Sequence, residues 1–199
     1  VFNVNHLNLH ENNGIDIDVR EGDNRTDTHF GIQELFFEKH VGDLTHFYDF
    51  FAFRGGIQAF TSDFRGFLFL ENQPGGRIVG SWHNNLWNYN LAYFRFIEKD
   101  TNSGLNEVFN DRKQDVIIAN LFRQDFIWKG YTLQVSYHFN YDHGDGHFDD
   151  NRFLRRPAPI GDRGAKQVRA HYLGINGEGH IGRLNISHSY YFAFGEESH

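Results

Sequence analysis

The densest set of metal-ligand side chains lies in one acidic segment. Residues 142–150 read Asp-His-Gly-Asp-Gly-His-Phe-Asp-Asp, so carboxylates and imidazoles crowd into a glycine-containing stretch. Ca²⁺ takes roughly six to eight oxygen ligands, whereas the imidazoles would better suit a transition metal. The spacing does not fit an EF-hand loop. Two interpretations follow: a Ca²⁺ site built from Asp142, Asp145 and Asp149, or a solvated, charged loop tip, which is the more common role of such a run.

Catalytic motifs are not apparent. The chain has 13 His, yet it contains no H-E-x-x-H and no G-x-S-x-G motif. The stretch 177–182 matches G-x-G-x-x-G by letter, but the residues after it alternate as a strand, so we expect its glycines to form a hairpin turn. Because there is no Cys, thiolate chemistry and disulfides within this chain are excluded. We expect no enzyme and, apart from Ca²⁺ in 142–150, no cofactor.

A further set of polar side chains recurs at alternate positions of strand-like segments. If the apolar side chains between them meet lipid, these polar groups face a water-filled interior, where charged rings set selectivity. Arginines favour anions because the guanidinium stays charged and binds carboxylates through a planar fork. The alternative is a polar ladder that holds the interior together. The candidate pore-lining residues are Arg54, Arg65, Asn88, Asn90, Arg123, Gln134, His138, Arg169, His171 and Arg183, and the same set includes Asp16, Asp18, Arg20, Gln58, Asn140 and Asn185.

The segment 131–141 shows which elements would position these groups. It reads Tyr-Thr-Leu-Gln-Val-Ser-Tyr-His-Phe-Asn-Tyr, an alternation of apolar or aromatic with small polar side chains. Successive strand side chains point to opposite faces, so this strand has one apolar face. Its terminal tyrosines lie about 33 Å apart at roughly 3.3 Å per residue. A tilt of about 40° reduces that to about 25 Å, the height of the apolar band of an outer-membrane barrel between its aromatic girdles.

Similar patterns elsewhere predict an all-β chain. We expect one β-barrel domain over residues 1–199, an antiparallel up-and-down transmembrane barrel. In 86–98 the alternation slips at Phe94-Arg95-Phe96, which suggests a bulge. Trp82, Trp87 and Trp128 fall near expected short turns, as in an interfacial girdle. The expected strands are 2–10, 14–20, 29–39, 47–59, 63–71, 77–83, 86–98, 114–127, 131–141, 165–176 and 180–194.

The expected connections alternate in length from residue 83 onward. Tight turns at 83–85, 129–130 and 177–179 alternate with long polar loops at 99–113 and 142–164. Outer-membrane barrels sort their connections this way, with short periplasmic turns and long extracellular loops. Eleven expected strands is an odd number, whereas bacterial single-chain barrels have even numbers. We therefore expect a fragment of a larger barrel.

Composition narrows the class of protein. The formal net charge is -7 and no basic run occurs, which argues against nucleic-acid binding. No window approaches the roughly 18 consecutive apolar residues of a spanning helix, although alternating barrel strands give a much weaker hydropathy signal. The chain contains no Met and shows no basic-then-apolar leader, so we expect a mature or trimmed segment.

Two stretches resemble segments of a known family. Residues 54–69 read Arg-Gly-Gly-Ile-Gln-Ala-Phe-Thr-Ser-Asp-Phe-Arg-Gly-Phe-Leu-Phe, and 179–194 read Gly-His-Ile-Gly-Arg-Leu-Asn-Ile-Ser-His-Ser-Tyr-Tyr-Phe-Ala-Phe. They are similar to Gram-negative outer-membrane porins of the alginate-export type and cover under a fifth of the chain. The resemblance implies a passive pore, permeable to anions or polysaccharides, in the outer membrane.

Three functions remain open from the sequence. The leading one is a porin-like channel for hydrophilic solutes, among them anionic or saccharide solutes, whose partners are the bilayer with its lipopolysaccharide. The second is a soluble or surface β-sandwich that binds carbohydrate. The third is a barrel that acts as a scaffold or sheath for a partner protein. A homo-oligomer is compatible with each of them.

Overall fold

The computed structural model describes residues 1–8, 24–47, 49–100, 103–148, 154–156 and 166–198, and these residues form strands, turns and bends. No helix that is long and apolar enough to cross a membrane occurs in these ranges. The all-β prediction is therefore confirmed for the described residues. The expected strand 14–20, with Asp16, Asp18 and Arg20, lies outside them.

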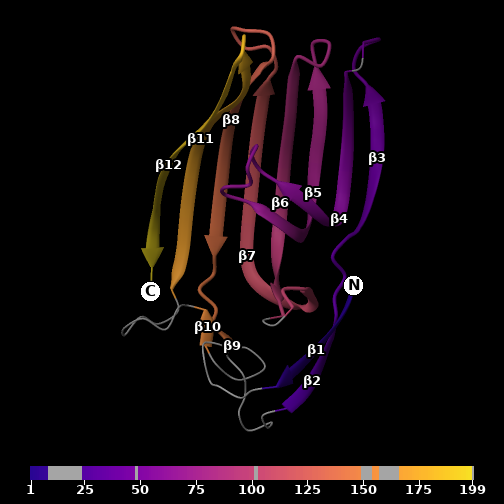
Figure 1. Cartoon of the computed structure of the whole chain (residues 1–199), viewed down its shortest axis with the longest axis vertical. Helices are drawn as coiled ribbons and strands as arrows, with labels where there is room; N and C mark the ends of the chain where they lie inside the picture. The colour runs from indigo at the N-terminus through magenta and orange to yellow at the C-terminus, as the bar shows by residue number, and fades with distance from the viewer. Residues whose placement is uncertain (9–23, 48, 101–102, 149–153, 157–165, 199) are drawn as a thin grey trace.

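One eight-stranded antiparallel sheet dominates the structure (Figure 1). Its spatial order, β12-β11-β8-β7-β6-β5-β4-β3, follows the chain, so the sheet is an up-and-down meander, as the sequence predicts. Among the described residues it has two edges, β3 and β12, and is not a closed barrel. The strands are β3 (Leu35–Asp43), β4 (Phe50–Thr61), β5 (Leu70–Trp82), β6 (Trp87–Lys99), β7 (Asn106–Arg123), β8 (Tyr131–Asp142), β11 (Gln167–Ile181) and β12 (Leu184–Ser198).

Two small strand pairs lie near one end of the sheet (Figure 1). The first joins β1 (Phe2–Asn8) to β2 (Asn24–Phe30), and the second joins β9 (His147–Phe148) to β10 (Leu154–Arg156). A β-sandwich would need a second large sheet packed on the first. The described residues contain none, so the sheet stands as a single layer.

Three expected boundaries are wrong. The expected strand 63–71 is mostly a turn region, because pairing between β4 and β5 ends at Thr61 and Leu70. The expected long loop 99–113 is short, because β7 already begins at Asn106. The expected turn at 177–179 lies within β11, and the turn to β12 falls at 182–183. Short and long connections therefore do not alternate as regularly as the sequence suggests.

The distal part of the β4–β5 hairpin leaves the sheet. β5 pairs with β6 only from Gly75 onward, whereas β4 and β5 stay paired toward the turn as far as Thr61 and Leu70. We call residues 58–73 the hairpin tip, and Figure 1 shows this purple segment crossing in front of β6 and β7. At the bend, Gly56 has φ +125°, and a Cβ on Gly75 would overlap the carbonyl oxygen of Tyr93. Only glycine accommodates both features, so it permits the tip to fold over the sheet.

Candidate functional site

The register of the strands divides the sheet into two faces. In β8, Gln134 and His138 point to one side and Val135 and Tyr137 to the other, because strand side chains alternate. The hairpin tip packs against the side that carries Gln134, as its contact with Ser62 shows. We call this side the covered face and the opposite side the open face.

The open face is apolar, and its side chains are exposed. All eight strands contribute, with exposed fractions from 37% at Phe53 to 66% at Tyr190. Soluble monomers rarely expose a contiguous apolar patch larger than a few hundred Å², so a face of this extent indicates a surface that meets a membrane or another protein. Its exposed members are Leu35, Phe37, Phe53, Trp82, Leu91, Tyr93, Ile117, Leu121, Val135, Leu173, Ile175, Leu184, Tyr190, Phe192 and Phe194.

Aromatic and charged residues mark the borders of the open face at both ends of β6 and β7. At the turn end, Trp82 pairs with Trp87, and the Arg123 guanidinium lies 5.2 Å from the Trp87 ring centroid. At the opposite end, Tyr93 is followed by Arg95. The expected position of Trp82 and Trp87 beside a short turn is confirmed.

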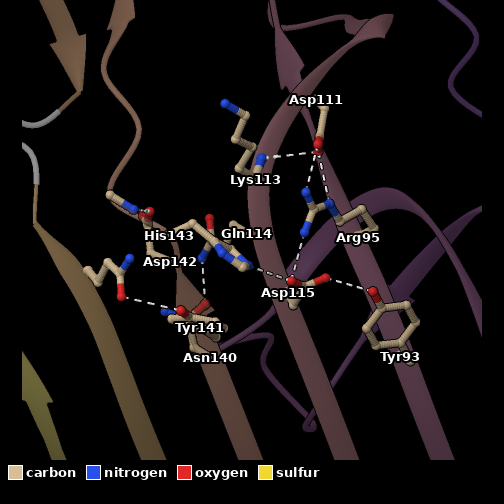
Figure 2. A network of polar contacts seen from close by, with 12 residues as sticks. Tyr93, Arg95, Asp111, Lys113, Gln114, Asp115, Asn140, Tyr141, Asp142 and His143 are labelled. Carbon is tan, nitrogen blue, oxygen red and sulfur yellow. Dashed lines mark hydrogen bonds and ion pairs between the residues drawn. The ribbon is translucent and has the colours of Figure 1, made fainter.

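Arg95 organises a polar network at that opposite end (Figure 2). Its Nε and Nη2 donate to the two carboxylate oxygens of Asp111 at 3.0 and 2.7 Å, and its Nη1 donates to Asp115 at 2.7 Å. The Tyr93 hydroxyl donates to the other oxygen of Asp115 at 2.6 Å, and His143 Nε2 lies 2.8 Å from Asp115 Oδ2. The apolar face therefore ends in a row of paired charges.

The covered face buries amides, a hydroxyl and an imidazole. Gln134 has no exposed surface, and His138 retains 3%. Asn120 and Gln134 both donate to the backbone oxygen of Ser62, at 2.8 and 2.7 Å. We call the group formed by Asn120, Gln134, Ser136, His138 and Asn176 the polar cluster; all five are buried.

Several polar atoms of this cluster have no protein partner among the described contacts. They include both ring nitrogens of His138, the Ser136 hydroxyl and the side-chain oxygens of Asn120 and Asn176. Buried polar groups are normally hydrogen-bonded to protein or water. These atoms leave the polar cluster with unused capacity to form hydrogen bonds.

Asp63 anchors the hairpin tip to β12 on the covered face. Its Oδ2 accepts a hydrogen bond from the Tyr191 hydroxyl at 2.7 Å, and its Oδ1 accepts the backbone N–H of Arg65 at 2.8 Å. Burial by itself raises the pKa of Asp63, but the hydrogen bonds from Tyr191 and from backbone N–H groups outweigh it, so the pKa lies below the ordinary value of 3.8. Asp63 therefore docks as a carboxylate.

Further contacts extend the docking across the sheet. Arg65 donates to the Ser187 hydroxyl of β12 at 2.9 and 3.1 Å. The Phe67 ring stacks on Tyr191 at a centroid distance of 5.7 Å, and the Phe64 ring meets Phe122 edge-on at 5.8 Å. One short tip thus contacts β7 and β12.

An apolar core lies beside the polar cluster on the same face. Phe94 is fully buried, and its ring centroid lies 5.3 Å from Phe60 and 4.9 Å from Phe69 of the tip. The bulge expected at 94–96 is confirmed, because the register with β7 shifts between Arg95 and Ile97, while Phe94 and Phe96 both stay on the covered face. The core comprises Phe60, Phe69, Ala92, Phe94, Phe96, Val116 and Ile118.

The ten candidate lining residues do not share one face. Five lie on the covered face as expected, namely Arg54, Asn88, Asn90, Gln134 and His138. Arg65 belongs to the hairpin tip that packs on it. The expectation is wrong for three, because register places Arg123 opposite Leu133, Arg169 opposite Tyr141, and His171 opposite Phe139, all on the open face.

Arg183 occupies the exposed turn between β11 and β12. Whether the covered-face residues line a pore stays a prediction. Of the wider set, Gln58 belongs to the hairpin tip, and Asn140 and Asn185 lie on the covered face with Val116 and His180 as their register partners.

The expected Ca²⁺ ligands do not converge among the described residues. Asp142 accepts the N–H of Gly144 at 2.9 Å, and Asp145 forms an ion pair with Lys113 at 2.7 Å. Asp149 lies outside the described residues. The described part of the loop is tied to the sheet by the ion pairs Lys113–Asp145 and Asp115–His143, and Ca²⁺ binding there stays a prediction.

Three sets of residues escaped the sequence analysis. Asp63 and Tyr191, 128 positions apart, meet only because the hairpin tip folds back. Arg77 pairs in register with Arg54 on the covered face, and alternation with Ile78 could have revealed it. In the described residues, ligand atoms of at least three acidic or His side chains also converge at His29, Asp100 and Glu107.

Comparisons with protein families, characterised proteins and solved structures give no match for this chain. Its function must therefore be inferred from its own residues and contacts.

Proposed function

We propose that the sheet is part of the wall of an outer-membrane pore through which hydrophilic solutes pass. The carrying observation is the inversion of burial between its faces: the apolar open face is exposed, and the polar cluster opposite is buried. Barrel strands in lipid have apolar side chains outward and polar side chains inward. The open face would meet lipid, and the covered face would meet the interior.

The dimensions of the open face support this assignment. In β7, Asp115 and Arg123 bracket an uncharged stretch on the open face, formed by Ile117, Ala119 and Leu121. Asp115 and Arg123 are about 26 Å apart along the strand at roughly 3.3 Å per residue, which a tilt of about 40° reduces to about 20 Å of height. An outer-membrane apolar band is about 25 Å tall, with aromatic girdles at its borders, so both charged residues would lie at or just inside those borders. The paired charges around Arg95 would lie at one membrane surface, beside lipid headgroups and lipopolysaccharide.

The hairpin tip would narrow the interior. It covers the central strands and leaves Arg54 and Arg77 on the same face nearer the turn end. Glu38 pairs with Arg54 at 2.5 Å, so these three side chains carry a net positive charge. Because the guanidinium groups of Arg54 and Arg77 stay charged, a path that passes them favours anionic solutes.

We infer that the closed wall has more than eight strands. The interior of an eight-stranded barrel is just wide enough to be filled by side chains. Here the covered face already holds a two-stranded hairpin tip, which shares a buried apolar core with β6 and β7. Unpaired backbone groups at the edges β3 and β12 would be costly in lipid, so further strands would pair with them.

The test compares the chain in lipid and in plain buffer. We expect it to need detergent or vesicles, to show heat-dependent gel migration, and to conduct ions in planar bilayers once its wall is closed. Replacing the turn 62–69 by Asn-Gly should raise conductance, since the constriction is shortened. The control is the same Asn-Gly replacement at the turn 182–183. A chain that stays monodisperse in buffer with its open face shielded would refute the proposal, and a stable bilayer-inserted wall without conductance would favour the scaffold role.

A further inference from the structure

Three side chains from separate segments meet at the end of the sheet where β6 joins β7. His29 belongs to β2, Asp100 follows β6, and Glu107 belongs to β7. One ligand atom from each lies within 4.8 Å of the others. Hydrogen bonds from one side chain to the backbone hold neighbouring segments together: the Asn106 amide donates to the carbonyl oxygens of Ile32 and Asn72, at 3.1 and 3.0 Å. The convergence is therefore built by the fold.

The electrostatics of this group call for a cation. Asp100 is 7% exposed, and the Glu107 carboxylate approaches it within the same 4.8 Å. No Lys or Arg pairs with either carboxylate among the described contacts. Asp100 Oδ2 accepts from Ser103, whereas its Oδ1 has no described partner. A positive charge placed between two neighbouring carboxylates, one of them buried, is stabilised by both of them.

One ring nitrogen of His29 lies beside a backbone carbonyl, which leaves the other available to a metal. His29 Nε2 lies 3.4 Å from the carbonyl oxygen of Asn106. The tautomer that donates from Nε2 keeps its lone pair on Nδ1, free to bind a metal. Ligating histidines commonly donate their other ring N–H to a backbone carbonyl or a carboxylate, which orients the ring.

We propose that His29, Asp100 and Glu107 bind one divalent transition-metal ion, with Zn²⁺ as the representative. Zn²⁺ accepts one nitrogen and two carboxylate oxygens and completes a four-coordinate shell with water. Ca²⁺ is less suited, because it prefers oxygen ligands only and more of them. The ion would tie β2 to the β6–β7 connection. This inference does not rest on the pore proposal and can fail or stand separately.

The test uses the full chain in detergent micelles or vesicles. Titration with ZnCl₂ by calorimetry should show one strong site per chain, and Co²⁺ in its place should give visible absorption bands of low coordination. His29→Ala and Glu107→Gln should each weaken that site at least about tenfold, since even outer-shell changes at metal sites cost that much. Both residues are only partly buried, so these variants should fold.

The control is His40→Ala. His40 lies 2.8 Å from Asp43, with both side chains exposed and no third ligand. His40→Ala should leave the Zn²⁺ affinity of the strong site unchanged while it removes one of the weak sites at which Zn²⁺ binds a histidine. Unchanged Zn²⁺ affinity in both His29→Ala and Glu107→Gln would overturn the proposal. So would a site that binds Ca²⁺ in preference to Zn²⁺.

Discussion

The two sides of β8 reverse the usual rule of burial. Val135 is 49% exposed on the open face, while its neighbours Gln134 and Ser136 have 0% and 1% exposed on the covered face. In a soluble protein the apolar side would form the core. The difference teaches that burial in this strand does not follow polarity: the polar side is buried and the apolar side is exposed.

The covered face itself is not uniform. Next to the polar cluster, Phe94 and Ile118 have no exposed surface because Phe60 and Phe69 of the hairpin tip pack on them. The polar cluster instead meets the backbone of Ser62. Apolar packing and polar docking thus occur side by side under one tip, whereas the open face has no covering element among the described residues.

Val135→Arg should have the largest effect, because it places a charge at the centre of the open face. In lipid, Arg at the midplane of a barrel strand costs about 2–4 kcal/mol. The measurement is the free energy of unfolding by urea in vesicles. In buffer the same change should not destabilise an exposed position.

Thr132→Arg, on the covered side of the same strand and half-buried near the turn end, is the comparison variant. Equal losses for Val135→Arg and Thr132→Arg in vesicles would show that lipid does not distinguish the two faces. The assignment of the open face to lipid would then fail.

Alternation in sequence was enough to predict both faces of β8 but not every charged residue. Arg169 and His171 have the same parity as Leu173 and Ile175, so the pattern itself places them on the open face. Their residue type suggested the interior instead. They lie near one end of β11, where the open face carries paired charges such as Arg169 with Glu196 at 3.1 Å. Position along the strand, which sequence determines poorly, decides their environment.

The hairpin tip could not have been predicted from local pattern. Residues 63–71 are rich in Phe and Leu, which favours a strand. The structure turns them over the sheet because glycines on both hairpin strands allow the bend and because long-range contacts such as Asp63 with Tyr191 stabilise it. The His29, Asp100 and Glu107 group was missed for the same reason: its members come from three segments far apart in the chain.

Asp63→Asn should weaken the docking on the covered face. Hydrogen bonds to a charged group contribute about 1.5–3 kcal/mol, and Asp63 accepts them from Tyr191 and from the tip backbone. Hydrogen exchange of the tip amides should rise while that of β8 stays unchanged. Asp125→Asn in the exposed turn between β7 and β8 is the control, since Asp125 accepts one bond, from Gly130.

The same carboxylate should make docking sensitive to acid. Because the folded pKa of Asp63 is below its ordinary value of 3.8, its contribution is fully present above pH 3.8 and is lost as pH falls through the folded pKa. The protection factor of the tip amides, which is the intrinsic exchange rate divided by the observed one, should therefore fall at acid pH in the wild type, and in Asp63→Asn it should be low and independent of pH. A parallel fall in both would assign the acid sensitivity to another group.

Gly75→Ala should disturb the bend that separates the tip from the sheet. A Cβ there would overlap the carbonyl oxygen of Tyr93, a backbone atom that cannot swing away. Overpacking of this kind costs about 1–3 kcal/mol. Gly42→Ala is the matched control, since a Cβ there meets nothing within 4 Å. Unfolding in urea should distinguish them, and equal stability would mean that the bend does not depend on Gly75.

Arg95→Lys should have the smallest effect, because it alters only the border between the open face and the solvent. Lysine keeps the charge but cannot form the paired bonds that Arg95 makes to Asp111, and the Arg95 side chain is 37% exposed, which screens the interaction. Exposed ion pairs contribute about 0.2–1 kcal/mol, so the loss should not exceed about 1 kcal/mol and should shrink as salt is added. Arg169→Lys, which affects a more exposed pair with Glu196, should cost less still. A loss that persists in high salt would place Arg95 within the apolar band, and the border of the open face would then have to be drawn beyond it.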